Sequence, residues 1–401
     1  MTPRARPRRL RRVLPVAALV LLLAPPAAAQ RLKVGMPLKD LQAAAQRDSN
    51  DAVAHYNVGL GYWSAKKYDD AEAALEAALE LDPRLAPAHI ALAYLPYARR
   101  GKLWEEVLRG TVPEEWRKPM EESDRHYRAA FLIDPLVDMR IVAAVTPGKA
   151  LAFEMLPEYA KAYDLLFRGF DDFQEGKYEE ALGRFNNLMR EVGWDTHQAD
   201  APSSLFWMRG LALGQLRRWE EARQDFTVLL TRAEEREAGD SLTHIPLRTN
   251  EYRYVLAYLN HRGGNLSVAT RLYREAVESD IGLYMAHVQL AAIHEAQGRV
   301  PEAIAERRLA INANPDDPTL VRDLGFTLGK AGRLEEALVP LGEAAERLPR
   351  DPTAQLYLGL VQFDLQHPAE ARAALERFLA LAPARMDRQV ALAKAKLAEL
   401  P

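Results

Sequence analysis

Cysteine is absent from the 401-residue sequence. Its absence excludes disulfide bonds, thiolate-bound zinc or iron–sulfur sites, cysteine nucleophiles and a lipidated N-terminal cysteine. The fold must therefore be held by packing. With 48% hydrophobic and 27% charged residues, the composition is that of a chain that buries a core rather than of a disordered one.

Basic clusters are scarce after the first 30 positions. The formal net charge of −3 combines 53 lysines and arginines with 56 aspartates and glutamates. Six of the arginines and none of the acidic residues lie in residues 1–30, which leaves 47 basic against 56 acidic groups in the rest. Because phosphate binding needs clustered lysine and arginine, this acidic body argues against nucleic acid as a partner.

Catalytic and metal-binding motifs are missing as well. The dipeptide His294-Glu295 begins like a zinc-protease motif, but Gly298 stands where the second histidine is required. Adjacent carboxylates such as Glu335-Glu336 point about 100° apart on a helix, which indicates a solvated face rather than an acid–base pair. We therefore expect no enzymatic activity, no cofactor and no metal site.

The first 29 residues have the pattern of a secretory signal peptide. Residues 1–12 are strongly basic, residues 13–24 are apolar, and Ala27 to Ala29 form a small-residue cleavage site. The apolar run is shorter than the roughly 20 residues that span a bilayer, and no later stretch is long and apolar enough. We expect cleavage near Ala29, an exported mature chain that is periplasmic or secreted, and no permanent membrane span in it.

A period of 34 residues organises the remaining sequence. Three prolines and three alanines recur at this spacing: Pro315, Pro349 and Pro383, and Ala303, Ala337 and Ala371. Self-similarity at this period is typical of helix–turn–helix repeats, in which one hairpin cannot bury its apolar face alone and stacking supplies the core. The sequence therefore predicts a solenoid of helices.

Residues 52–85 resemble the tetratricopeptide repeat (TPR) family. The positions that carry the resemblance are Val58, Gly59, Tyr62, Tyr68, Ala71, Leu75, Ala78, Asp82 and Pro83. Gly59 and Ala71 are small where the paired helices approach, and Tyr62 and Leu75 are large enough to fill the gap to the neighbouring repeat. Proline after the second helix ends it.

Extending this register predicts an all-α fold, a right-handed α-solenoid of about eight TPR-like helix hairpins with a C-terminal capping helix at residues 384–400. The hairpins begin near Ala52, Ala86, Ala162, Ser203, Asn250, Tyr284, Pro318 and Pro352. The expected domains are a signal peptide at 1–29, a linker with an N-terminal capping segment at 30–50, and the TPR solenoid at 51–401. An insertion is expected near 101–122, and longer spacers near 136–161, 190–202 and 231–249.

In this family, ligands usually lie in the concave groove lined by the first helices of successive repeats. The resemblance therefore implies a peptide-binding groove rich in aromatic side chains, which offer large contact area at low entropic cost. Carried over residue by residue, the groove consists of Tyr56, Asn57, Trp63, Tyr163, Phe167, Phe170, Phe173, Trp207, Tyr254, Tyr258, His261, Tyr357 and Phe363.

Three functions compete at this point. The leading one is an exported scaffold or adaptor that binds protein or peptide segments in its groove and mediates protein–protein interaction in the cell envelope. The second is a glycan- or small-ligand-binding module that uses the groove aromatics as stacking platforms. The third is an enzyme with its site in residues 86–161, joined to a repeat scaffold.

Overall fold

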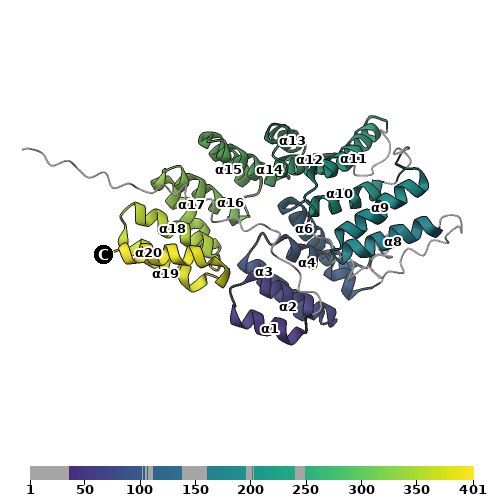
Figure 1. The fold of residues 1–401 in the computed structure, drawn as a ribbon. Coiled ribbons are helices and arrows are strands. Elements are labelled where there is room, and N and C mark those ends of the chain that lie inside the picture. The colour runs from purple at the N-terminus through teal and green to yellow at the C-terminus, as the bar shows by residue number, and fades with distance from the viewer. Residues whose placement is uncertain are drawn as a thin grey trace, which may run out of the picture. The chain divides into compact units, whose positions relative to one another are not determined.

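The computed structural model describes residues 36–101, 103, 106, 112–137, 160–195, 201, 203–239 and 249–401. The expected signal peptide and its cleavage site at Ala29 lie outside these residues, as do the start of the linker and parts of the insertion and the spacers. Within the described residues every regular element is a helix (Figure 1).

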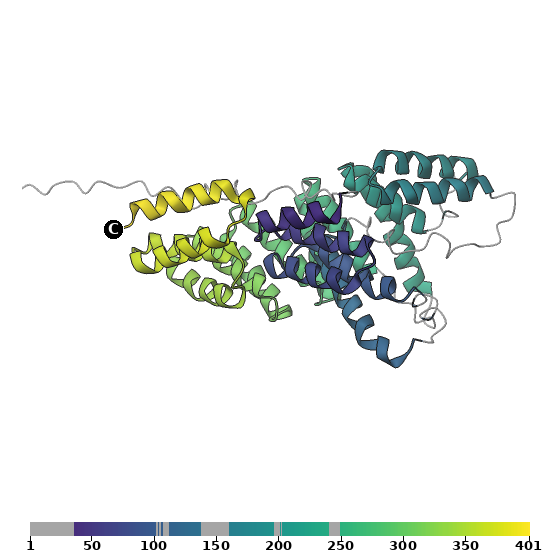
Figure 2. The same cartoon turned by 90° about the horizontal axis from the view of Figure 1, so that it is seen from below.

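The described helices form eight pairs that follow one another along the chain. Figures 1 and 2 show their ribbon from two sides. The pairs are α2 (Ala52–Ser64) with α3 (Tyr68–Leu81), α4 (Ala86–Arg99) with α6 (Arg117–Ile133), α8 (Ala160–Gln174) with α9 (Tyr178–Val192), α10 (Ser203–Gln215) with α11 (Trp219–Gly239), α12 (Thr249–Arg262) with α13 (Leu266–Ser279), α14 (Tyr284–Ala296) with α15 (Val300–Ala313), α16 (Pro318–Lys330) with α17 (Leu334–Arg347), and α18 (Pro352–Asp364) with α19 (Pro368–Leu381). Helix α1 (Leu38–Arg47) precedes them and α20 (Asp387–Glu399) follows them. The short 3₁₀ helices η3 (Glu114–Trp116) and η6 (Ala384–Met386) lead into α6 and α20. The predicted all-α fold of about eight hairpins with a C-terminal capping helix is confirmed.

Two helices extend into segments that the sequence assigned to an insertion and a spacer. Helix α6 begins at Arg117, inside the expected insertion at 101–122, and α11 continues to Gly239, inside the expected spacer at 231–249. Both hairpins thus have a second helix longer than the 14 residues of α3 or α13.

The turn inside most hairpins contains one residue with a positive φ. The seven such residues, with φ between 58° and 84°, are Lys66, Gly176, Arg217, Gly264, Gly298, Gly332 and Gln366. This left-handed conformation costs a residue with a Cβ about 1–2 kcal/mol, which explains the glycines. The last four of these residues, from Gly264 to Gln366, are spaced 34 residues apart. The turn therefore recurs with the same period as the sequence.

Glycine on the first helix allows the two helices of a hairpin to touch. A Cβ on Gly59 of α2 would lie 2.7 Å from Leu75 Cγ of α3, and 3.3 Å from the Ala71 carbonyl. The same contact recurs in other hairpins between residues 16 apart: Gly169 and Phe185, Gly210 and Phe226, Gly325 and Leu341, and Gly359 and Leu375. The small side chains therefore lie where the sequence placed them, and Leu75 packs against Gly59 inside its own hairpin.

The described chain separates into two compact units, Lys33–Leu320 and Val321 onward. In the C-terminal unit, α20 packs on α18 and α19 through a buried cluster that includes Leu360, Phe378 and Ala393. Lys396 of α20 lies 4.3 Å from the centroid of the Phe363 ring. The last helix therefore covers the apolar face that the final hairpin would otherwise expose.

In the larger unit, the end of α6 packs against helices far along the sequence (Figure 1). Leu132 and Leu136 belong to one buried cluster with residues of α9 to α14. The Tyr254 hydroxyl donates to the Leu132 carbonyl at 2.6 Å, and Gln215 Nε2 donates to the Leu136 carbonyl at 2.5 Å. The end of the second hairpin is therefore part of the core that α10 and α12 form.

Candidate functional site

The predicted groove residues divide by exposure. Buried are Tyr56, Asn57, Trp63, Phe173, Tyr254 and Tyr357, and partly exposed are Phe170, Trp207, Tyr258, His261 and Phe363. Tyr163 and Phe167 lie in α8, but their side chains are outside the described part of the structure. All thirteen lie on first helices, as the repeat register requires. Of the eleven whose side chains the structure describes, only the five partly exposed ones present surface to a ligand.

The chain itself occupies the face of α10 and α12 around Tyr254. The Tyr254 ring has no exposed surface and lies 5.7 Å from the ring of Phe131, which comes from α6. Burial, and after it the Asp134 carboxylate, raises the pKa of the neighbouring Tyr258 hydroxyl, so this group stays protonated. Sequence reasoning did not find this contact, because the apolar run at residues 130–133 carries no signal of its partner 122 residues away.

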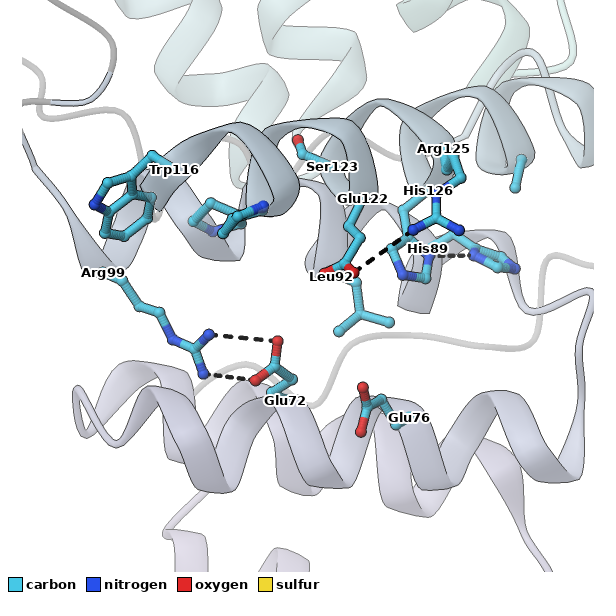
Figure 3. Close-up of a pocket in the computed structure, with 13 residues that line it drawn as sticks. Glu72, Glu76, His89, Leu92, Arg99, Trp116, Glu122, Ser123, Arg125 and His126 are labelled. Atoms are coloured by element: carbon cyan, nitrogen blue, oxygen red, sulfur yellow. Dashed lines mark hydrogen bonds and ion pairs between the residues drawn. The ribbon is translucent and has the colours of Figure 1, made fainter. Parts of the chain in front are cut away.

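A separate cavity of about 510 Å³ opens between α3, α4 and α6 (Figure 3). Helix α4 contributes His89, Leu92, Pro96 and Arg99, whose spacing of three and four residues places them on one face. The remaining lining residues are Glu72 and Glu76 of α3, Trp116 of η3, and Pro119, Glu122, Ser123, Arg125, His126 and Ala129 of α6. None of these was a predicted site residue, because no motif links them.

Ser123 fixes α6 against α4 at the back of this pocket. Its buried hydroxyl donates to the carbonyl of Ala93, one residue after Leu92 on α4. The hydroxyl is therefore committed to a structural hydrogen bond rather than available as a nucleophile.

Two histidines in the pocket form a directed hydrogen-bond chain. His89 Nε2 lies 3.0 Å from the Pro83 carbonyl, which can only accept, so this nitrogen carries the proton. His89 Nδ1 is then the acceptor in its 2.9 Å contact with His126 Nδ1, which must donate. The remaining nitrogen, His126 Nε2, is left with a free lone pair.

Both imidazoles are neutral at pH 7. Burial lowers the pKa of His89, and burial, followed by the nearby His89 and Arg125, lowers the pKa of His126 to about 4. At His89, the cost of burying the charged form outweighs the attraction of Asp82 and Asp317, and at His126 no carboxylate offsets this cost. The pair therefore offers a hydrogen-bond acceptor to the pocket and no positive charge.

The arginines of the pocket are already paired, whereas one carboxylate is not. Arg99 Nη2 lies 2.7 Å from Glu72 Oε2 and 2.8 Å from Asp69 Oδ1, and Arg125 Nη2 lies 3.6 Å from Glu122 Oε1. Glu76 faces the cavity from α3 in Figure 3 and makes no hydrogen bond or ion pair within the described residues. Partial burial and the charges of Glu72, Glu122 and Glu80 raise its pKa.

The histidine pair and Ser123 supply hydrogen-bonding groups rather than a strong base or a free nucleophile. An imidazole with a pKa of about 4 is a weak base at neutral pH, and the hydroxyl of Ser123 is hydrogen bonded elsewhere. In the described part of the chain, no cluster of three or more histidine, aspartate or glutamate side chains is placed to hold a metal ion. The described helices also include none that combines the length and the apolarity needed to cross a membrane.

Comparison with protein families identifies the repeats. One tetratricopeptide repeat family matches residues 52–85, and a second matches residues 254–318 and 322–385. The chain is a tetratricopeptide repeat protein. Among the helices that line the pocket of the TPR protein, α3 lies within the matched residues 52–85. Helices α4 and α6 lie outside all of the matched residues.

Several solved structures resemble parts of this TPR protein at low identity. The C-terminal part of a TPR repeat-containing protein from Cytophaga hutchinsonii is 16% identical, with a TM-score of 0.42 over 53% of this chain and 78% of that one. A TPR protein from Parabacteroides merdae is 14% identical, with a TM-score of 0.38 over 76% of this chain and 98% of that one. The MamA protein is 13% identical, with a TM-score of 0.37 over 47% and 91%. No curated protein matches the chain.

Proposed function

We propose that this TPR protein is an exported scaffold that binds segments of partner proteins in the cell envelope. The observation that carries the proposal is the run of tandem TPR hairpins, since stacked repeats form extended binding surfaces. Export rests on the basic, apolar and small-residue pattern of residues 1–29.

Partner binding is proposed at the first-helix aromatics that remain partly exposed. Trp207 of α10 packs edge-on against Phe226, with ring centroids 5.2 Å apart, and Phe170 of α8 packs in the same manner against Phe185 at 6.1 Å. Each ring is fixed by a buried neighbour and still presents surface. Rigid aromatic side chains of this kind give contact area at little entropic cost.

Site-specific photocrosslinking in the native host tests this proposal. A photoreactive phenylalanine derivative replaces Phe170 or Trp207, and the control replaces Glu180, an exposed residue on the second helix α9. We expect the same partner peptides at Phe170 and Trp207 and none of them at Glu180. Identical crosslinks at all three positions, or none at the two aromatic positions, would contradict groove binding.

Export is tested on the same cells by fractionation and intact-mass analysis. We expect the envelope fraction to contain a chain that begins at Gln30, because cleavage is predicted after Ala29. A chain that retains residues 1–29 and stays in the cytoplasm would refute export while leaving the scaffold function open to the crosslinking test.

A further inference from the structure

We propose that the pocket between α3, α4 and α6 binds the lysine or arginine side chain of a partner segment. This inference rests on the scaffold function proposed above and assigns it a second contact point. It follows from the cavity, from the orientation of its hydrogen-bonding groups and from the balance of charge along its walls.

The pocket offers acceptors to an incoming group. The hydrogen-bond chain from Pro83 through His89 leaves His126 Nε2 with a free lone pair. Glu76 adds carboxylate oxygens from the opposite wall, across from His89 and Leu92 in Figure 3. A ligand that donates several hydrogen bonds therefore complements these walls, as an ammonium or a guanidinium does.

The charge of the lining also favours a cation. Three carboxylates, Glu72, Glu76 and Glu122, face two guanidinium groups, Arg99 and Arg125. With both histidines neutral, one negative charge is left without compensation. An anionic ligand would be repelled by this excess negative charge. To reach Arg99 it would have to displace Glu72, whose Oε2 lies 2.7 Å from Arg99 Nη2. A cation contacts Glu76 directly.

Apolar walls accommodate the stem of a long basic side chain. Leu92 and Pro96 of α4 and Pro119 and Ala129 of α6 line the same cavity as the acceptors. Lysine and arginine bury their methylene stems on apolar surface while the charged end contacts polar groups. At the rim, the Arg100 guanidinium lies 5.5 Å from the Trp116 ring centroid, so this aromatic already accepts a cation.

The hydrogen-bond acceptors and the apolar walls together favour a basic side chain over other cations. A metal ion needs several histidine or carboxylate ligands converging on one point, and the described residues provide no such cluster. A small free amine would use the acceptors but not the apolar walls. The pocket therefore matches an ammonium or guanidinium that arrives on an aliphatic stem.

Calorimetric titration of the mature chain, residues 30–401, with three capped tripeptides tests the inference. Their central residue is lysine, arginine or norleucine between two alanines, and putrescine is titrated as a free amine. We expect the lysine and arginine tripeptides to bind and the norleucine tripeptide to bind at least about ten-fold more weakly, since it keeps the stem and lacks the charge.

Two substitutions on one helix assign the binding to the pocket. Glu76→Gln removes the unpaired carboxylate without breaking a described contact and should weaken the basic tripeptides about ten-fold. Glu80→Gln, one turn away on α3 and outside the lining, serves as the control and should weaken binding far less than Glu76→Gln, because the Glu80 carboxylate acts on Glu76 only through its charge.

Three results would overturn the inference: equal binding of the norleucine tripeptide, equal effects of the two substitutions, or tighter binding of putrescine than of either basic tripeptide. Circular dichroism of both variants establishes that the fold is retained. Because photocrosslinking at Trp207 tests the scaffold independently, partner crosslinks without tripeptide binding would refute the pocket inference alone.

Discussion

Replacing Tyr254 by phenylalanine isolates the hydrogen bond that joins α12 to the end of α6. The Leu132 carbonyl is among the last four of α6, which have no partner inside their own helix. Residue 136, whose amide would serve it in a longer helix, donates to Asp134 Oδ1 instead. The Tyr254 hydroxyl, 2.6 Å away, therefore satisfies a buried acceptor.

The substitution should lower the free energy of unfolding by about 2 kcal/mol, because it leaves a buried carbonyl without a donor. Tyr273→Phe is the matched control. The Tyr273 ring is equally buried and lies 5.7 Å from Tyr254, but its hydroxyl has no hydrogen-bond partner within the described residues. Removing it should be neutral or slightly stabilising.

Hydrogen exchange measured by mass spectrometry on peptides from α6 and α12 reports this effect locally, and urea unfolding of the mature chain reports it globally. We expect exchange in both helices to accelerate about 30-fold in Tyr254→Phe and to stay unchanged in Tyr273→Phe. Equal destabilisation by the two variants would show that the hydroxyl of Tyr254 contributes nothing beyond ring packing, and the reasoning would fail.

Three further predictions concern the repeats and the pocket. Gly325→Ala should destabilise the C-terminal unit by about 1–3 kcal/mol, because the new Cβ would lie 2.6 Å from Leu341 Cγ. Gly342→Ala on α17 should stabilise the same unit by up to about 1 kcal/mol, because the new Cβ would meet no atom within 4 Å. Thermal unfolding measures both effects. Gln366→Gly, at a turn φ of 63°, should raise the melting temperature by relieving about 1 kcal/mol of strain, and an unchanged or lower value would contradict the strain. In the folded chain His126 has a pKa of about 4, below its ordinary value of 6.5. Its contribution to the free energy of unfolding is therefore complete above pH 6.5 and is lost as the pH falls towards 4. Allowing for partial exposure, wild type should lose about 2 kcal/mol more than His126→Asn over this interval in urea titrations, and parallel profiles would refute the assignment.

The sequence predicted the helices closely because local contacts define them. The predicted starts at Ala86, Ser203 and Tyr284 coincide with the first residues of α4, α10 and α14. These starts come from extending the repeat register, which depends on contacts between helices that are neighbours in the chain.

The pocket and the occupied face of α12 could not be predicted in the same way. His89 and His126 are 37 residues apart and meet only because α6 begins within the expected insertion and returns along α4. Likewise, Tyr254 is an aromatic residue at a groove position, and nothing near it in the sequence indicates that Leu132 covers it. Periodicity identifies which residues face inward but not which distant segment they contact.

The contacts between α6 and the later helices change how this chain should fold. In an ordinary repeat array each hairpin touches only its neighbours, so segments can open one at a time. Here Arg128 pairs with Asp280 across 152 residues, and Tyr254 bonds to Leu132 across 122. Such pairings raise the contact order. A higher contact order slows folding, because the entropic cost of closing a long loop arises before the stabilising contacts form. The same pairings join the second hairpin to the fifth, so hairpins that are distant in sequence should unfold together.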